Sequence, residues 1–275
     1  MELGEVIGRG RSGEVYEYGA DQVLKLFYMH TSKAWVEHEY RVSQIIQQEP
    51  LPIARVYEIV EIDDRTGIVY ERITGKTLLN HLFTYPDQME WIAETCAEVL
   101  SRIHQCNNAQ LPSQRDSIID RIRQADIPAD WKEQALDLLS GLPDDSAVCH
   151  GDYHPDNIIL SSGGPVVIDW SAASSGNSCA DYVRSVLILQ IATAPEPEYT
   201  ERFNRIRDQF LSLFEKAYMK RVKINTAELD HWFIVVAIAR LLDGIASEKE
   251  QLLQIISEGF KQLNGGDPHE SGARN

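Results

Sequence analysis

The sequence has little that would tie it to structural zinc, to a membrane or to secretion. Its four cysteines form no CxxC pair and no histidine-rich cluster, which argues against zinc and favours a reduced, cytoplasmic location. The amino terminus has neither the basic start nor the apolar stretch of a signal peptide. The most apolar segment, residues 232–246, is interrupted by Arg240 and Asp243 and is too short to span a bilayer. We therefore expect a buried helix there and no membrane partner.

Basic residues are also scarce relative to acidic ones. The chain has 26 Lys and Arg against 42 Asp and Glu, a formal net charge of −16. Such a surface repels phosphate backbones, so we expect no nucleic-acid partner, and it would favour cationic small molecules. An acidic surface can equally serve only to keep a soluble protein dispersed. The 275 residues, 43% of them hydrophobic, suffice for one large domain or two smaller ones.

The first quarter of the chain has the pattern of β-strands around a single helix. Strands are predicted at 3–7, 14–18, 23–27, 54–62 and 67–71 from alternating or β-branched runs separated by turn residues. The spacing of apolar residues becomes helical over 32–48, with Thr31 or Ser32 as the N-cap. The segment Thr74-Gly75-Lys76 is typical of a hinge. These features indicate a small β-rich lobe, residues 1–74.

The rest of the chain is mostly helical in pattern. Apolar positions at helical spacing predict helices at 89–105, 115–124, 129–140, 181–192, 198–220 and 226–262, the last broken near Gly244 or Ser247. Two short apolar segments within 147–169 interrupt them. Residues 264–275 are polar and glycine-rich, which is typical of a frayed tail. The expected architecture is α+β, with a larger α-helical lobe over 75–263.

The most informative motif lies in that interruption. His150-Gly151-Asp152-Tyr153-His154-Pro155-Asp156-Asn157 is followed by Val167-Ile168-Asp169, which places two acids and an amide at the ends of apolar runs. In a phosphoryl-transfer site, one acid orients a hydroxyl nucleophile while an amide and a second acid hold magnesium against the phosphates. Asp152 suits the first role, and Asn157 and Asp169 suit the second.

A glycine-rich segment near the start is compatible with phosphate binding. Gly8, Gly10 and Gly13 match a GxGxxG pattern, which in a dinucleotide-binding fold requires a helix directly afterwards. Here the β-branched and aromatic run 14–18 follows. A strand–loop–strand hairpin over the phosphates therefore fits better, because glycines let backbone amides approach phosphate oxygens closely.

Lys25 and Glu39 form a candidate ion pair. Lys25 lies inside an apolar strand, where a lysine is costly unless it is paired. It either holds phosphates or points to solvent from an edge strand. Glu39 shares an otherwise apolar helical stripe with Trp35, Val42 and Ile46, and a buried acid needs a cationic partner. We prefer it to Glu37, which lies on a more polar face.

Together these residues resemble the aminoglycoside phosphotransferase and choline kinase-like family, relatives of the protein kinases. The strongest part of the resemblance is His150-Gly151-Asp152 with Asn157, then Ile168-Asp169-Trp170, then Asp181. It extends over nearly the whole chain and implies a bilobal protein-kinase-like fold with a small antiparallel N-terminal lobe. It also implies ATP and Mg²⁺ as cofactors.

The resemblance also implies individual roles. Asp152 would be the catalytic aspartate, Asn157 and Asp169 the magnesium ligands, and Lys25 with Glu39 the phosphate-positioning pair. The glycine loop would cover the phosphates. The hinge residues Glu71, Arg72 and Ile73 would offer backbone groups to the adenine, and Asp181 would brace the catalytic loop.

Three histidines remain to be interpreted. His154 either helps to neutralise the transferring phosphoryl group or only hydrogen-bonds the backbone of its turn. We interpret His150 and His104 as structural, because His150 precedes a glycine in the loop and His104 ends a helix.

Departures from the protein-kinase pattern favour a small-molecule acceptor. Gly151 replaces the arginine of the HRD motif, Trp170 follows Asp169, and eleven residues separate Asp169 from Asp181, too few for an activation segment. The predicted activity is that of an ATP-dependent small-molecule kinase, which transfers the γ-phosphate to a hydroxyl of a cationic aminoglycoside, choline-like amine or amino-sugar. The alternatives are a protein or peptide kinase and a non-catalytic nucleotide-binding scaffold.

Acidic residues in the helical lobe bear on the acceptor. They either attract a cationic substrate or form solvated helix faces. The residues are Asp116, Asp120, Asp126, Glu133 and Asp137.

Overall fold

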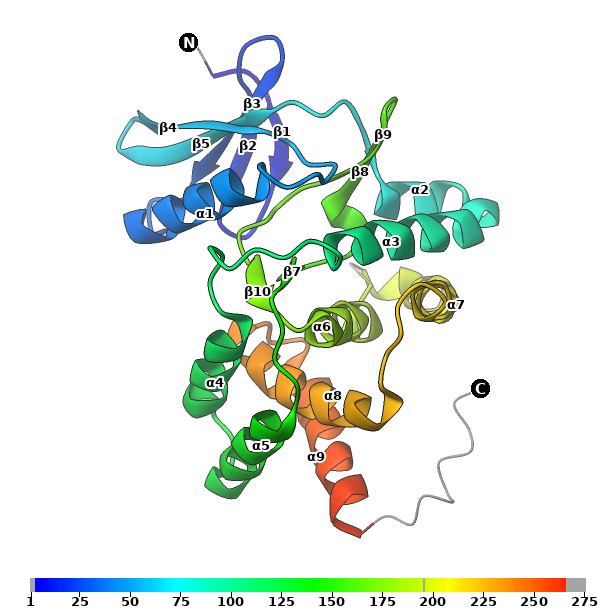
Figure 1. Ribbon diagram of the computed structural model, residues 1–275. Coiled ribbons are helices and arrows are strands. Elements are labelled where there is room, and N and C mark those ends of the chain that lie inside the picture. The colour runs from blue at the N-terminus through cyan, green and yellow to red at the C-terminus, as the bar shows by residue number, and fades with distance from the viewer. Residues whose placement is uncertain (1–2, 195, 266–275) are drawn as a thin grey trace.

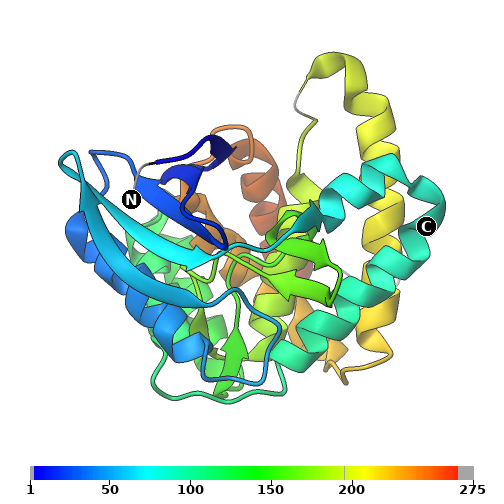
Figure 2. The ribbon, with the colours of Figure 1, turned by 90° about the horizontal axis from the view of Figure 1, so that it is seen from above.

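The computed structural model describes residues 3–194 and 196–265, and it shows two lobes (Figure 1). The smaller lobe is a sheet with one helix against it, and the larger is mainly helical. Figure 2, seen from above, shows the sheet on one side of the hairpin formed by β8 (Ile158–Ser161) and β9 (Gly164–Val167). Helices α3 (Met89–Ile103) and α7 (Thr200–Met219) lie on the other side. The predicted α+β, two-lobed organisation is confirmed.

The sheet of the first lobe is antiparallel, with strand order β1-β2-β3-β5-β4. Its strands are β1 (Val6–Arg9), β2 (Gly13–Glu17), β3 (Gln22–Phe27), β4 (Val56–Ile62) and β5 (Arg65–Glu71). Strand β3 is central, so Lys25 does not lie on an edge strand. Strands β4 and β5 meet at a tight turn in which Asp63 and Asp64 have positive φ, a conformation that short polar side chains tolerate best.

Helix α1 (Lys33–Ile46) covers one face of this sheet, and the Ser32 hydroxyl caps its first turn. Its buried positions are Val36, Glu39, Val42, Ser43 and Ile46. The buried acid agrees with the sequence interpretation, but the inclusion of Trp35 was wrong. Trp35 is 44% exposed and stacks on His38, because α1 turns Val36 rather than Trp35 toward the sheet.

The predicted hinge at 74–76 is partly a strand. Strand β6 (Gly75–Thr77) pairs with β8 (Ile158–Ser161), which pairs with β9 (Gly164–Val167), so this three-stranded sheet begins directly after the first lobe. A Cβ built on Gly75 would lie 2.2 Å from the carbonyl oxygen of Leu160. The glycine is therefore required for close backbone approach, not for flexibility.

We expect Gly75→Ala to lower the free energy of unfolding by about 1–3 kcal/mol, because the added methyl overpacks the β6–β8 pair. Gly141→Ala is the matched control, since a Cβ there meets nothing within 4 Å. It should change stability by less than about 1 kcal/mol, in the stabilising direction. Urea denaturation measures both, and an equal response of the two variants would contradict the steric argument.

One extensive core fills the larger lobe as far as Phe260, and it includes Val42 and Ile46 of α1, so it reaches the first lobe. The helices of the larger lobe are α2 (Leu78–Thr84), α3 (Met89–Ile103), α4 (Gln114–Gln124), α5 (Ala129–Gly141), α6 (Ser178–Ile191), α7 (Thr200–Met219), α8 (Thr226–Arg240) and α9 (Lys249–Gly265), with the short 3-10 turns η1 (Pro86–Gln88), η2 (Pro155–Asn157), η3 (Pro197–Tyr199) and η4 (Leu241–Asp243). The predicted break near Gly244 is confirmed, because η4 ends there in a left-handed residue.

Two further expectations concern the ends of elements. The expected tail began at residue 264, but Asn264 and Gly265 still belong to α9, and 266–275 lie outside the described residues. Helix α2 was not anticipated, because its run of seven residues after β6 is too short to show a helical period.

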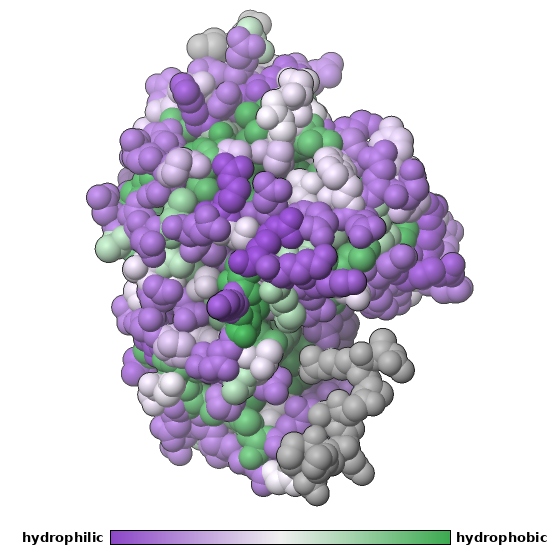
Figure 3. Space-filling view, turned by 45° about the vertical axis from the view of Figure 1, so that its right-hand side comes forward, coloured by the Kyte–Doolittle hydropathy of each residue, from purple (hydrophilic) through white to green (hydrophobic). Residues whose placement is uncertain are grey.

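The surface that Figure 3 displays is mostly hydrophilic, with hydrophobic residues emerging in small separate areas. Within the described residues, no helix combines the length and the apolar character needed to cross a bilayer. The four cysteines are free thiols, and Cys96 and Cys149 are buried.

Candidate active site

The site is built on residues 150–157, which we call the DN loop. It connects β7 (Ala147–Cys149) to β8 and ends with η2, and β7 pairs with β10 (Ser174–Gly176). Tyr153 anchors the loop, since its side chain is 1% exposed and its hydroxyl donates to the carbonyl of Cys96 on α3 at 2.7 Å. The loop is therefore fixed from below by packing and by a buried hydrogen bond.

His150 joins the two halves of the sequence motif. Its Nδ1 accepts from the Asp152 backbone N–H at 3.2 Å, so Nε2 carries the proton that is donated to the Ile168 carbonyl at 3.1 Å. Its ring packs on Trp170, with centroids 4.5 Å apart. Complete burial lowers the pKa of His150 and keeps the ring neutral. The interpretation of His150 as structural is confirmed.

Asp181 on α6 holds the start of the DN loop. Its carboxylate accepts the backbone N–H groups of His150 at 2.8 Å and Gly151 at 2.7 Å, while His104 lies 3.0 Å from it. The carboxylate is 1% exposed. Burial alone would raise its pKa, but His104, His150 and the Gly151 amide together lower the pKa below its usual range. The bracing contact and the structural place of His104 are confirmed.

Gly151 is required by two independent features of its backbone. Its φ is +78°, a left-handed conformation that side chains rarely adopt, and an added Cβ would lie 2.4 Å from the carbonyl oxygen of Ala172. The turn places the backbone of Gly151 in close contact with Ala172, three residues after Asp169. Arg184 on α6 donates from Nε to the Gly151 carbonyl, which closes the turn from the other side.

Asp152, His154 and Asn157 converge at the open side of the loop. Asn157 Nδ2 donates to the Asp152 carbonyl at 2.9 Å and lies 3.4 Å from its carboxylate, and His154 Nε2 lies 3.7 Å from the same carboxylate. The Asp152 side chain is 40% exposed and so can reach a ligand. Burial opposes its charge, but His154 and Arg184 lower the pKa of Asp152 well below its ordinary value.

Asp169 lies directly beside this group. The Ile168 N–H donates to the Asn157 carbonyl at 3.0 Å, so the residue before Asp169 is hydrogen-bonded to the end of the DN loop. Asp169 itself has φ +58°, which marks a strained turn, and its carboxylate accepts from the Ser171 hydroxyl at 3.1 Å.

The donor set here fits a hard cation. Because Asn157 Nδ2 faces the DN loop, its amide oxygen points the opposite way, and Asp169 adds a half-exposed carboxylate. Magnesium takes oxygen ligands and is commonly held by one or two protein groups together with substrate phosphates. In the part of the chain that is described, no group of three His, Cys, Asp or Glu side chains could hold a metal ion.

Lys25 reaches from the sheet of the first lobe to Glu39, its predicted partner, and also to Asp169, which was not predicted as a partner. Its Nζ lies 2.7 Å from Glu39 and 3.3 Å from Asp169, and so joins β3, α1 and the larger lobe. Burial lowers the pKa of Lys25, but Asp169 and Glu39 outweigh it and raise the pKa, which keeps the ammonium charged. Tyr70 on β5 also donates to Glu39, at 3.0 Å.

The glycine loop connects β1 and β2, and a strand rather than a helix follows it, as the sequence predicted. The three glycines differ in how much space a side chain would have at their positions. A Cβ on Gly13 would lie 2.5 Å from the Leu26 carbonyl, so this glycine lets β2 approach β3. Around Gly10 the nearest described atom is 3.8 Å from such a Cβ, and Gly8 meets only ordinary van der Waals contacts.

Two backbone N–H groups of the predicted hinge after β5 already donate to other parts of the protein. The Glu71 N–H donates to the carbonyl of Arg55 at 2.8 Å, and the Arg72 N–H donates to the carbonyl of Asp21 at 3.0 Å. Both donors are therefore occupied, which leaves Ile73 better placed than Glu71 to offer an N–H to a ligand.

The acidic residues considered for substrate attraction are all exposed on, or next to, α4 and α5: Asp116, Asp120, Asp126, Glu133 and Asp137. Asp120 lies 3.7 Å from Arg123 one turn along. This pattern fits solvated helix faces, so these residues provide no separate argument for a cationic acceptor.

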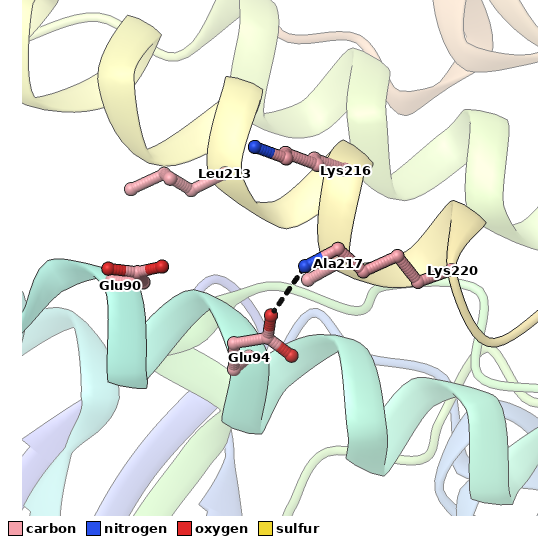
Figure 4. A pocket seen from close by; sticks show the side chains of 6 residues that line it. All are labelled: Glu90, Glu94, Leu213, Lys216, Ala217 and Lys220. Carbon is pink, nitrogen blue, oxygen red and sulfur yellow. Dashed lines mark hydrogen bonds and ion pairs between the residues drawn. The ribbon is translucent and has the colours of Figure 1, made fainter.

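A small hollow between α3 and α7 lies outside the site (Figure 4). Its walls are Glu90, Glu94, Leu213, Lys216, Ala217 and Lys220. Glu94 pairs across it with Lys220 at 3.4 Å, and none of these residues belongs to the DN loop or the first lobe. We assign the hollow to the packing of α3 against α7.

Sequence reasoning missed Tyr70 and Arg184. Arg184 had a detectable signal, because it is a charged residue three positions after Asp181 in an otherwise apolar helix, which places both on one face. Tyr70 had no such signal in the sequence, since aromatic residues are common in strands.

Comparison with known proteins agrees with this geometry. A model of the phosphotransferase enzyme family (APH) matches residues 4–211, so the chain belongs to that family. Aminoglycoside 3'-phosphotransferases of Escherichia coli and Salmonella typhimurium are 26% and 25% identical to it over an alignment of 181 residues that covers 56% of this chain. The match spans 65% of the length of these relatives, slightly under two thirds.

Solved structures share the fold at lower identity. Amicoumacin kinase hAmiN, determined with AMP-PNP, Ca²⁺ and Ami, superposes with a TM-score of 0.61 at 15% identity, over 94% of this chain and 88% of that one. A choline/ethanolamine kinase family protein from Mesorhizobium loti superposes with a TM-score of 0.58 at 14% sequence identity, over 96% of this chain and 89% of that one. The expected protein-kinase-like fold and family resemblance are confirmed.

Proposed function

We propose that the protein is an ATP-dependent small-molecule kinase, which transfers the γ-phosphoryl group of magnesium ATP to a hydroxyl. The observation that supports this best is the convergence of the DN loop on the Lys25–Glu39–Asp169 ion-pair chain. A cation for phosphates, oxygen ligands for a metal and a carboxylate for the nucleophile thereby meet in one place, as phosphoryl transfer requires.

The proposed division of labour follows the geometry. Lys25, held by Glu39, positions the phosphates, while the glycine loop covers them and the Ile73 N–H meets the base. Asn157 and Asp169 hold magnesium, which supplies charge neutralisation when bound. Asp152 orients the acceptor hydroxyl and takes its proton late, since its low pKa keeps it anionic but makes it a weak base. His154 helps to neutralise the transferring group.

The acceptor that we propose is a small cationic molecule of the aminoglycoside, choline-like or amino-sugar type. The net charge of −16 supports this, as do the names of the relatives. A protein acceptor is disfavoured because β10 and its pairing with β7 occupy the segment between Asp169 and Asp181. Part of this short segment is therefore committed to the β10–β7 pair, which leaves little chain for a segment that binds a polypeptide.

Thermal unfolding with magnesium ATP tests nucleotide binding directly. A ligand at a hundredfold excess over its dissociation constant stabilises the native state by roughly 2.7 kcal/mol, so we expect a clear upward shift in Tm. Lys25→Met should reduce that shift, whereas Lys33→Met, an exposed lysine of the same lobe, should not. No shift in the wild type would contradict the kinase proposal.

The same assay extended to acceptors separates the alternatives. Amino-sugars, amino-alcohols and amino acids are added with the nucleotide, and ADP release is followed. A shift with nucleotide but no ADP release across the panel would favour a scaffold. Transfer of labelled phosphate onto proteins, with none to small molecules, would favour a protein kinase.

A further inference from the structure

An arginine cluster outside the predicted site surrounds Asp243, the last residue of η4. Arg121 on α4, Arg184 on α6 and Arg240 at the end of α8 all donate to its carboxylate. The distances from Asp243 to Arg184 and Arg240 are 2.8 Å and 3.3 Å. The Asp243 side chain is 13% exposed, so three cations from three helices meet at one largely buried acid.

The cluster is electrostatically costly to assemble. Arg240 also has a second carboxylate partner, the buried Glu248, which it binds through two nitrogens at 2.9 Å and 2.8 Å. Burial lowers the pKa of Arg121, and the neighbouring Arg184 and Arg240 add to that effect against the attraction of Asp243. Like charges at this spacing destabilise unless a shared anion holds them, and Asp243 is that anion.

The cluster contacts the DN loop directly. Arg184 uses Nη2 for Asp243 and Nε for the carbonyl of Gly151, the residue before Asp152. The peptide that follows this carbonyl leads into Asp152. Because Asp243 holds the guanidinium in one orientation, it determines where the Gly151 carbonyl is held, and thus how Asp152 is presented.

The cluster also contacts the first lobe. Arg11, inside the glycine loop, donates from Nη2 to the backbone carbonyl of Asp243 at 2.7 Å. Gly244, with φ +67°, ends η4 immediately afterwards and leaves that carbonyl at the end of the turn. One residue of the larger lobe therefore meets the glycine loop through its backbone and the DN loop through its side chain.

We propose that Asp243 is a positioning residue, which sets Asp152 through Arg184 and docks the glycine loop through Arg11. The inference rests on the proposed phosphoryl transfer and adds a residue outside its predicted site. It predicts a specific loss: turnover should fall while nucleotide affinity changes little when the Asp243 carboxylate is lost, because Lys25, Glu39 and Asp169 remain in place.

The main test compares Asp243→Asn with Glu248→Gln. Both remove one charge from a carboxylate bound to Arg240, but only the first releases Arg184. We expect Asp243→Asn to lower kcat at least about 10-fold and to change KM for nucleotide by less than about threefold, since small misplacements of reacting groups cost rate. Glu248→Gln should keep kcat within about twofold of wild type. Equal losses in both variants, or near-normal kcat in Asp243→Asn, would overturn the proposal.

Arg184→Lys provides a second, milder variant in case Asp243→Asn does not fold. It keeps the charge but lacks the forked geometry that serves Gly151 and Asp243 together. We expect a similar loss of kcat, and no further loss when both substitutions are combined, because they remove the same contact. Additive losses would show that Asp243 acts separately from Arg184.

Amide hydrogen exchange makes the outcome independent of any acceptor. In Asp243→Asn, exchange of residues 150–152 should accelerate, and Glu248→Gln should leave it unchanged. Arg11→Gln should accelerate exchange in residues 8–13, with Arg9→Gln, an exposed arginine of the same loop, as its control. If the wild-type protein transfers no phosphate, the proposed function fails, but amide exchange still tests the positioning role of Asp243. Unchanged amide exchange in both Asp243→Asn and Arg11→Gln would refute that positioning role.

Discussion

Asp152→Asn is expected to lower turnover at least about 100-fold, which corresponds to about 2.7 kcal/mol in the activation barrier. The substitution keeps the size of the side chain and removes the anion that we propose orients the acceptor hydroxyl. Nucleotide binding should persist, because the substitution leaves in place the ion pairs of Lys25 with Glu39 and Asp169, to which we assign the nucleotide phosphates and their metal. Steady-state ADP release measures the first effect, and the nucleotide-induced shift in Tm measures the second.

Asp156→Asn is the matched control for this experiment. Asp156 belongs to the same loop but is exposed, and its neighbour Pro155 is buried, so the turn itself should stay intact. Turnover of this variant should stay within about threefold of wild type. If Asp152→Asn also retained such activity, the assignment of Asp152 would be wrong even if the nucleotide site were correct.

Asp181→Asn is expected to have the largest effect on stability, about 3–5 kcal/mol at neutral pH. The carboxylate accepts two backbone N–H groups and lies against His104, all in the interior. An amide offers one acceptor oxygen in place of two, so one buried donor would lose its partner. Urea denaturation at pH 7 measures the loss, and the start of the DN loop should become disordered with it.

The pH dependence of this loss follows from the pKa of Asp181. The pKa is lowered in the native state, so the carboxylate contributes stability above its unfolded pKa of about 3.9, and that contribution declines as pH falls further. The difference between wild type and Asp181→Asn should therefore shrink in acid. Asp116→Asn, an exposed acid in the first turn of α4, should cost less than about 1 kcal/mol at any pH. A pH-independent deficit for Asp181→Asn would contradict the electrostatic account.

Much of the site could be predicted because its charged residues occur in apolar stretches of sequence, where burying an unpaired charge costs free energy. A lysine in an apolar strand and an acid on a buried stripe demand partners, and Lys25 and Glu39 prove to lie 2.7 Å apart. The strand after the glycine loop was predicted correctly because residues 14–18 are β-branched and aromatic. Where the pattern carried less information, as at Trp35 and at Gly75, the interpretation was wrong, since helical phase and strand pairing depend on what packs opposite.

The sequence by itself determined the two-lobed organisation, the pairing of Lys25 with Glu39 and the strand that follows the glycine loop. These follow from local chemistry: periodicity and charge in apolar surroundings. The family resemblance already implied that Asp181 braces the DN loop. Only the tertiary structure decided that Arg184 meets the Gly151 carbonyl and that Asp243 meets Arg184. Those contacts join residues 33 and 59 positions apart, and no local pattern encodes which distant group an arginine will meet.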